Sequence, residues 1–397
     1  MKQTIRVLQI AFTYIGTVVG AGFATGQEIL QFFTQYGWWA SFTIIVATVI
    51  FVWFGTKLML LAHHIKAHSY EDVNHALFGK RIGSTVSLFT MVVIICVNSV
   101  MLAGAGAVFV EHFNMHYQTG LLLTLVGSFW IINRGMGAIL HLNSIVAPTM
   151  ILFTILIVAH TLSMPNASQF LTFSTDKPLY AAWTAPFLYG AFNLAMAQAV
   201  LVPLGASMPN KTVVKLGGII GGVVIGCMLL AGHFALSAQM PGITQFDIPM
   251  GHIASGLGLA IQLVYVMLIF SEIFTTFLAD IFGVTLQLQQ RTRLNKKLII
   301  FMIMLFCYMM SQFGFRSLVS VLYPLFGMFS LVWLYLLIRI RTPFDAALTP
   351  KDPPAASTLL HANNNEPDIA SATHIHMLTT IPKGPATTLR SNKKPHP

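Results

Sequence analysis

Residues 14–28 read YIGTVVGAGFATGQE, and four glycines lie within eleven residues of this apolar stretch. Each glycine weakens a helix by about 1 kcal/mol relative to alanine. Glycines also let two helices pack closely, and Gly16-xxx-Gly20 fits that motif. Close packing leaves the small and polar neighbours and the carboxylate of Glu28 without an explanation. A discontinuous helix accounts for all of them, because its freed carbonyls can coordinate a cation while the next half-helix presents amides to an anion.

The composition indicates a membrane protein. Of 397 residues, 55% are hydrophobic and 9% are charged, and the mean hydropathy is +0.73. A soluble domain has about 25% charged residues. These values exclude a water-soluble globule, a secreted disulfide scaffold and a disordered protein. The three cysteines lie inside apolar runs and do not have the spacing of metal ligands. The composition therefore predicts an all-α polytopic membrane protein.

Ten apolar stretches are long enough to cross a hydrocarbon core of about 30 Å, which requires about 20 helical residues. The predicted spans are 8–33, 39–61, 84–110, 119–137, 143–163, 183–205, 216–237, 254–280, 298–313 and 316–340.

The basic residues in the connections predict the orientation. With the N-terminus inside, fifteen Lys and Arg residues fall on the cytoplasmic side before the tail is counted, and only Lys177 and Arg316 fall outside. We therefore expect both termini in the cytoplasm and a location in the inner (plasma) membrane. The net charge of +10 is then a topological signal, and no nucleic-acid partner follows from it.

Two regions outside the spans have their own patterns. Residues 342–397 are polar and rich in proline, without apolar periodicity, and we expect a disordered cytoplasmic tail behind a transmembrane domain at 1–341. In the connection 62–83, Ser69 followed by Asp72 resembles a capping box. This predicts a short helix at the membrane surface, which is either a gate or a simple linker.

A second candidate interruption lies in the sixth span. Tyr189-Gly190-Ala191-Phe192-Asn193 is followed there by Gln198 and by Val202-Pro203-Leu204-Gly205. Spans one to five occupy 8–163, and spans six to ten occupy 183–340. Because five is an odd number of spans, the second half enters the membrane from the opposite side. Interrupted helices that open two inverted halves are typical of transporters built from inverted repeats.

Residues 16–28, the Pro203-Leu204-Gly205 ending of the sixth span and the ten-span layout resemble the YkvI-type bacterial membrane proteins. These are similar to distant members of the amino acid–polyamine–organocation superfamily, which has the LeuT fold. The resemblance covers about 1–340. It implies a five-plus-five inverted repeat in which helices 1 and 6 are broken.

The resemblance also implies two binding regions. In sodium-coupled members of the superfamily, a cation lies between carbonyls of the broken first span and hydroxyls of the eighth. The matching groups are the carbonyls of Gly16, Val19 and Glu272 and the hydroxyls of Thr275 and Thr276. The solute carboxylate would meet the amides just after the break. The matching residues are Ala21, Gly22 and Phe23 at these amides, Tyr189, Phe192 and Asn193 on the opposite wall, and Asn98 on the third span.

Glu28 and Glu272 are carboxylates at or near membrane depth. An unpaired charge costs several kcal/mol at the bilayer centre, so such residues are functional candidates by default. Either one can bind a proton during transport or complete a cation site. The structural alternative, a carboxylate hydrogen-bonded to neighbouring helices, stays open for both.

These features favour a secondary active transporter of a small solute, such as an amino acid or a related compound, coupled to Na⁺ or H⁺ by alternating access. The expected partners are the solute and the lipid bilayer, and no cofactor is expected beyond the coupling ion. A membrane sensor that binds a solute on the same scaffold without net transport is the main alternative, and a channel is a third. The sequence has no Walker-type, zincin or nucleophile-elbow motif, so we do not expect an enzyme.

Overall fold

The computed structural model describes residues 2–67, 69–132 and 136–339, and every element in these ranges is helical. The predicted tail, 342–397, lies outside the described residues. The helices of the first half are α1 (Lys2–Val18), α2 (Ala21–Thr25), α3 (Gln27–Phe32), η1 (Thr34–Tyr36), α4 (Trp39–Ile50), η2 (Phe51–Gly55), α5 (Thr56–Ile65), α6 (Tyr70–Phe78), α7 (Lys80–Phe113), α8 (Tyr117–Ile132) and α9 (Met136–Leu162). Those that follow are α10 (Gln169–Thr172), α11 (Leu179–Ser207), α12 (Lys211–Ser237), η3 (Gly242–Gln245), α13 (Pro249–Ser255), α14 (Leu259–Arg291), α15 (Lys296–Ser311) and α16 (Phe315–Arg339).

Within the described ranges, six helices are long and apolar enough to cross a membrane by length and composition. They are Trp39–Ile65, Lys80–Phe113, Leu179–Ser207, Lys211–Ser237, Leu259–Gln289 and Phe315–Arg339. Tyr117–Ile132 and Pro148–Leu162 are shorter apolar helices. The chain is therefore a multi-pass helical membrane protein, while the count of ten spans stays a prediction.

The predicted start of the eighth span is wrong. Instead of one helix from residue 254, the structure has the short helix α13, which ends at Ser255, and a separate helix α14, which begins at Leu259. Gly258 lies between them with a φ of +97°, a conformation that favours glycine and ends the first helix.

The sixth predicted span, α11, is continuous from Leu179 to Ser207, so the predicted break near Tyr189–Asn193 is wrong. Its glycines serve close packing instead. A Cβ added at Gly190 would overlap the side chain of Ile50, and one added at Gly205 would overlap the backbone of Met59. Small residues at such positions let helices approach one another without any interruption of the backbone.

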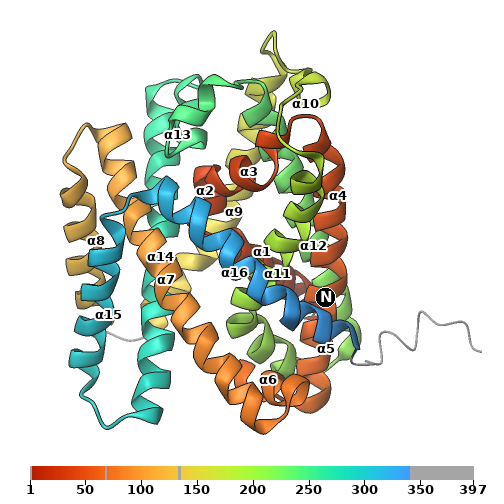
Figure 1. Ribbon diagram of the computed structural model, residues 1–397, viewed down its shortest axis with the longest axis vertical. Coiled ribbons are helices and arrows are strands. Elements are labelled where there is room, and N and C mark those ends of the chain that lie inside the picture. Colours follow the sequence, from red (N-terminus) through yellow and green to blue (C-terminus); the bar gives the residue numbers. More distant parts are fainter. Residues whose placement is uncertain (1, 68, 133–135, 340–397) are drawn as a thin grey trace, which may run out of the picture. The chain divides into compact units, whose positions relative to one another are not determined.

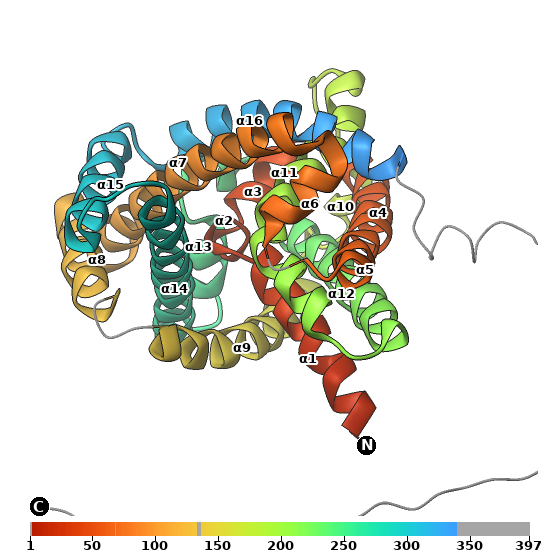
Figure 2. The same ribbon diagram turned by 90° about the horizontal axis from the view of Figure 1, so that it is seen from below.

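The short helices α2 and α3 lie in the interior of the helical bundle. In Figure 1 they lie behind α16, and Figure 2, seen along the bundle, shows them between α7 and α16 on one side and α9 and α1 on the other. Helix α1 packs on α12, α11 packs on α16 and on α5, and α14 packs on α7. The interruption after α1 is thus surrounded by the long helices.

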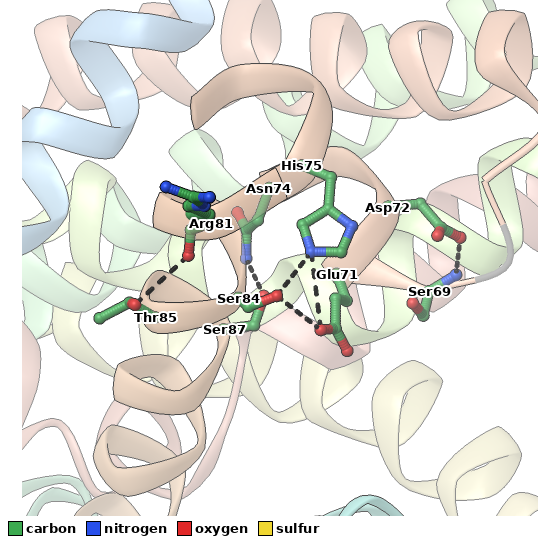
Figure 3. A network of polar contacts seen from close by, with 9 residues as sticks. All are labelled: Ser69, Glu71, Asp72, Asn74, His75, Arg81, Ser84, Thr85 and Ser87. Atoms are coloured by element: carbon green, nitrogen blue, oxygen red, sulfur yellow. Dashed lines mark hydrogen bonds and ion pairs between the residues drawn. The ribbon is translucent and has the colours of Figure 1, made fainter. Parts of the chain in front are cut away.

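Helix α6 caps the end of the bundle opposite α10 and α13 (Figure 1). The predicted capping box is confirmed, because the carboxylate of Asp72 accepts a hydrogen bond from the Ser69 N–H at 3.1 Å. Figure 3 shows how α6 is held on α7: the Asn74 amide donates to the Ser87 hydroxyl at 3.0 Å, and His75 contacts the Ser84 hydroxyl at 2.9 Å. Helix α6 is therefore docked on α7 by side-chain hydrogen bonds.

Candidate functional site

The first helix is interrupted at Val19–Gly20. Helix α1 ends at Val18, Gly20 has extended backbone angles (φ −88°, ψ −169°), and α2 begins at Ala21. The Gly20 N–H turns back to the carbonyl of Val18 at 2.9 Å. As a result, among the described residues no hydrogen bond reaches the carbonyls of Gly16 and Val19. Two main-chain oxygens are thus left without a donor in the middle of the bundle.

A second bend follows at Gly26, between α2 and α3. Gly26 has a φ of +83°, which glycine adopts without strain, and its N–H closes α2 by donating to the Phe23 carbonyl at 2.9 Å. The Thr25 hydroxyl donates to the Gly22 carbonyl at 2.9 Å. The residues of α2 are all buried, so the bend places the start of α3 in the interior of the protein.

The bend at Gly26 directs Glu28 back onto α2. Its side chain is 4% exposed, and its carboxylate packs so closely on Gly22 that a Cβ there would overlap it. The phenol groups of Tyr189 on α11 and Tyr323 on α16 are near enough to interact with this carboxylate. Nevertheless, neither Oε2 of Glu28 nor the hydroxyl of Tyr189 has a hydrogen bond of normal geometry to any described residue. Three separate helices thus bring polar oxygens together.

Aromatic rings enclose this group of oxygens. The ring of Tyr189 is 5.2 Å from those of Phe32 and Phe33 and 5.9 Å from that of Phe51, measured between centroids. On the other side, the ring of Tyr323 packs at 4.4 Å on Phe192. All six of these aromatic side chains are buried. We call Glu28, Tyr189, Tyr323 and these rings the Glu28 site.

Three further amide side chains lie on α7 and α11: the predicted wall residue Asn193, the predicted candidate Asn98 on the third span, and Gln198. Asn193 donates from its side-chain amide to the Tyr189 carbonyl at 3.0 Å, within α11. Asn98 is fully buried on α7, which packs against α2 and α11, and both polar atoms of its side chain lack a partner among the residues that the structure describes. Gln198 on α11 is also buried, and in the described part of the chain neither polar atom of its side chain has a partner.

The remaining predicted cation ligands lie on α14. Glu272 is 5% exposed, and its carbonyl accepts a hydrogen bond from the buried Thr275 hydroxyl at 3.2 Å, while Thr276 is half-buried. The hydrogen bond that joins α14 to α2 comes from Tyr265, which donates to the Ala24 carbonyl at 3.1 Å. Between the threonine pair and the carbonyls of the interruption, the described chain has no hydrogen bond.

Sequence reasoning missed Tyr323. Tyr323 precedes Pro324 in an apolar run, and a phenol next to a helix-interior proline at membrane depth is the signal that could have found it. His233 on α12 is fully buried, and its Nδ1 lies 3.2 Å from the Thr34 hydroxyl.

Comparison with known proteins defines the class. No model of a known protein family matches the chain. The structure superposes on the crystal structure of MhsT in complex with L-phenylalanine with a TM-score of 0.66, covering 83% of this chain and 88% of that one at 11% sequence identity. The protein therefore has the fold of a LeuT-type membrane protein.

Two relatives from Bacillus subtilis (strain 168) identify the family. The membrane protein YkvI is 38% identical over 338 residues, which are 84% of this chain and 96% of YkvI. The protein YyaD is 23% identical over 324 residues, covering 82% of this chain and 93% of YyaD. The chain belongs to the YkvI family of bacterial membrane proteins.

Proposed function

We propose that this protein is a secondary active transporter of a small solute, an amino acid or a related compound, coupled to Na⁺ or H⁺ by alternating access. One observation carries the proposal: a helix is interrupted inside a bundle of membrane helices, with unpaired carbonyls and a buried carboxylate beside the interruption. The fold shared with MhsT, whose crystal structure contains L-phenylalanine, supports this class of solute.

In the proposed solute site, the carboxylate of the solute binds near the interruption. The residues proposed for its amides are Ala21, Gly22 and Phe23, all of them buried. Tyr189, Phe192 and Asn193 form the facing wall, and Asn98 supplies a buried amide whose donor and acceptor both lack a partner within the described ranges. Unpartnered polar atoms in a buried site are costly, and a bound solute would satisfy them.

For a coupling cation, the residues present fit the chemistry. A hard monovalent ion takes oxygen ligands that replace its hydration shell. The carbonyls of Gly16 and Val19 accept no hydrogen bond within the described part of the chain, so they are free to act as ligands. The proposed ligands on α14 are the Glu272 carbonyl and the hydroxyls of Thr275 and Thr276. If protons drive transport instead, Glu28 and Glu272 are the proposed carriers, because both are buried carboxylates.

The proposed orientation places both termini in the cytoplasm and the protein in the bacterial inner membrane, following the distribution of basic residues. Helix α6 then lies on the cytoplasmic side, and α10 and α13 lie on the outer side (Figure 1). Access alternates between these two ends.

Uptake of L-phenylalanine and other amino acids into proteoliposomes, driven by an inward Na⁺ gradient or by a pH gradient, tests the proposal. If Na⁺ is the coupling ion, Thr275→Ala should reduce Na⁺-dependent uptake by about tenfold, which corresponds to about 1.4 kcal/mol. Ser271→Ala is the matched control, because it removes a hydroxyl on the same helix that donates to its own backbone, at the Met267 carbonyl.

Uptake that ignores both gradients, in a sample whose thermal unfolding shows it to be folded, contradicts coupling. Binding of an amino acid without accumulation would favour the sensor alternative over transport.

A further inference from the structure

The carboxylate of Glu28 is buried without a positive partner. Glu28 is 4% exposed, and its Oε2 has no hydrogen bond to a described residue. Within the described ranges, no Lys, Arg or His forms an ion pair with it, and the groups that interact with it are the phenols of Tyr189 and Tyr323. A buried carboxylate that lacks a counter-charge is strongly unfavourable, so Glu28 binds either a proton or a positive group from outside the chain.

The surroundings of Glu28 distinguish between kinds of cation. Na⁺ prefers several oxygen ligands at once, whereas the walls of the Glu28 site are largely carbon. The rings of Phe32, Phe33 and Phe51 surround Tyr189, and Phe192 covers Tyr323. Aromatic faces combined with one carboxylate are the surroundings that bind ammonium groups, through attraction between the cation and the π electrons.

The position of Glu28 relates it to the solute. Its carboxylate packs on Gly22, one of the residues proposed to meet the solute carboxylate, and interacts with Tyr189, which belongs to the facing wall. In an α-amino acid, the amine and the carboxylate are attached to the same carbon atom. A solute whose carboxylate lies at α2 therefore places its amine within reach of Glu28.

We propose that Glu28, with Tyr189 and Tyr323, is the site that recognises the protonated amine of the solute. The proposal rests on the proposed function, since it assigns a chemical class to the same site: organic amines, with or without a carboxylate. The carboxylate accepts the N–H donors of the ammonium group, and the phenol oxygens and ring faces complete its surroundings. Solutes without an amine leave Glu28 unpaired and are rejected.

Binding of two matched sets of probes tests this recognition. Each set contains an amino acid, the same molecule without its carboxylate and the same molecule without its amine: L-phenylalanine, 2-phenylethylamine and 3-phenylpropionate, and L-leucine, 3-methylbutylamine and 4-methylpentanoate. Isothermal titration or thermal shift on purified full-length protein gives the affinities. We expect the amine-bearing probes to bind about tenfold more tightly, or more, than the acids.

The variants show whether Glu28 causes the selectivity. Glu28→Gln should abolish the preference for amines over acids, and Tyr323→Phe should reduce it. Tyr117→Phe is the control for a lost phenol, because Tyr117 on α8 donates to the Ser311 carbonyl at 2.6 Å and does not belong to the Glu28 site. Glu71→Gln, on α6, is the control for a lost carboxylate. Both controls should keep the wild-type ratio of affinities.

The inference and the proposed function fail in different ways. An unchanged preference for amines in folded Glu28→Gln, or folded wild-type protein that binds no amine-bearing probe, overturns the inference. If Na⁺ alone shifts the stability of the wild type and Glu28→Gln abolishes that shift without changing amine affinity, Glu28 is a sodium ligand and the inference is wrong. If amines bind through Glu28 but do not accumulate in proteoliposomes, the inference stands and transport is wrong.

Discussion

The first helix and α11 both have glycines at membrane depth, yet only one of them is interrupted. The chain between α1 and α3 breaks at Val19–Gly20 and bends at Gly26, whereas α11 continues through Gly190 and Gly205. The difference lies in what surrounds each glycine. In α11 the space of the missing Cβ is filled by Ile50 and by the backbone of Met59.

At the interruption the surroundings are of another kind. A Cβ at Gly20 would meet no atom within 4 Å, and Gly26 has a positive φ. In the continuous helix α11 the filled Cβ positions of the glycines report close packing, whereas the non-helical backbone angles of Gly20 and Gly26 report changes of chain direction. The sequence pattern alone does not separate the two, because both kinds appear as glycine in an apolar run.

The largest expected loss of stability is at Gly26. Gly26→Ala combines an unfavourable positive φ with overlap of the Met250 side chain, and we expect a decrease in the free energy of unfolding of about 2–4 kcal/mol. Thermal unfolding in detergent measures it. Gly258→Ala separates the two causes, since Gly258 has a φ of +97° with no atom within 4 Å of the added Cβ. Equal losses in both variants would show that overlap with Met250 contributes nothing.

A smaller loss is expected in the continuous helix. Gly205→Ala overlaps the backbone of Met59, which cannot rotate away, and should cost about 1–3 kcal/mol. Gly190→Ala should cost less, because the Ile50 side chain can move. Unchanged thermal stability of Gly205→Ala together with reduced uptake would indicate that α11 opens near Gly205 during function. The contrast between α11 and the interrupted first helix would then disappear.

The smallest effect on stability is expected at Gly20. Its φ of −88° suits any residue and the space beside it is open, so Gly20→Ala should change the free energy of unfolding by no more than about 1 kcal/mol, in the stabilising direction. Circular dichroism and thermal unfolding measure it together with uptake. A larger stabilisation with loss of uptake would show that alanine rejoins α1 to α2, and that this glycine alone keeps them apart.

Much of the fold follows from the sequence because it depends on local patterns. Hydropathy gives the apolar helices, and the Ser69–Asp72 spacing gives the start of α6. The break inside the eighth predicted span could not be found in this way. Gly256 and Gly258 lie in an apolar run that satisfies the requirement for a span, and the turn there depends on backbone angles that the pattern does not contain.

The candidate site was predictable only in part. Glu28 and Tyr189 are recognisable as polar groups at membrane depth, but their proximity depends on the bend at Gly26 and on the packing of α11 against α3. Tyr323 comes from a helix nearly 300 residues further along the chain, so no spacing rule connects it with Glu28. Side chains that meet only through tertiary packing leave no local pattern.

The docking of α6 has a consequence for spectroscopy. The indole N–H of Trp333 on α16 donates to the Asn74 side chain at 3.0 Å, and of the six tryptophans, all in the described ranges, only Trp333 is buried. Separation of α6 from α16 would break this bond and expose the indole to water. Its fluorescence emission would then shift to longer wavelengths, so the protein contains its own optical reporter for opening at this end.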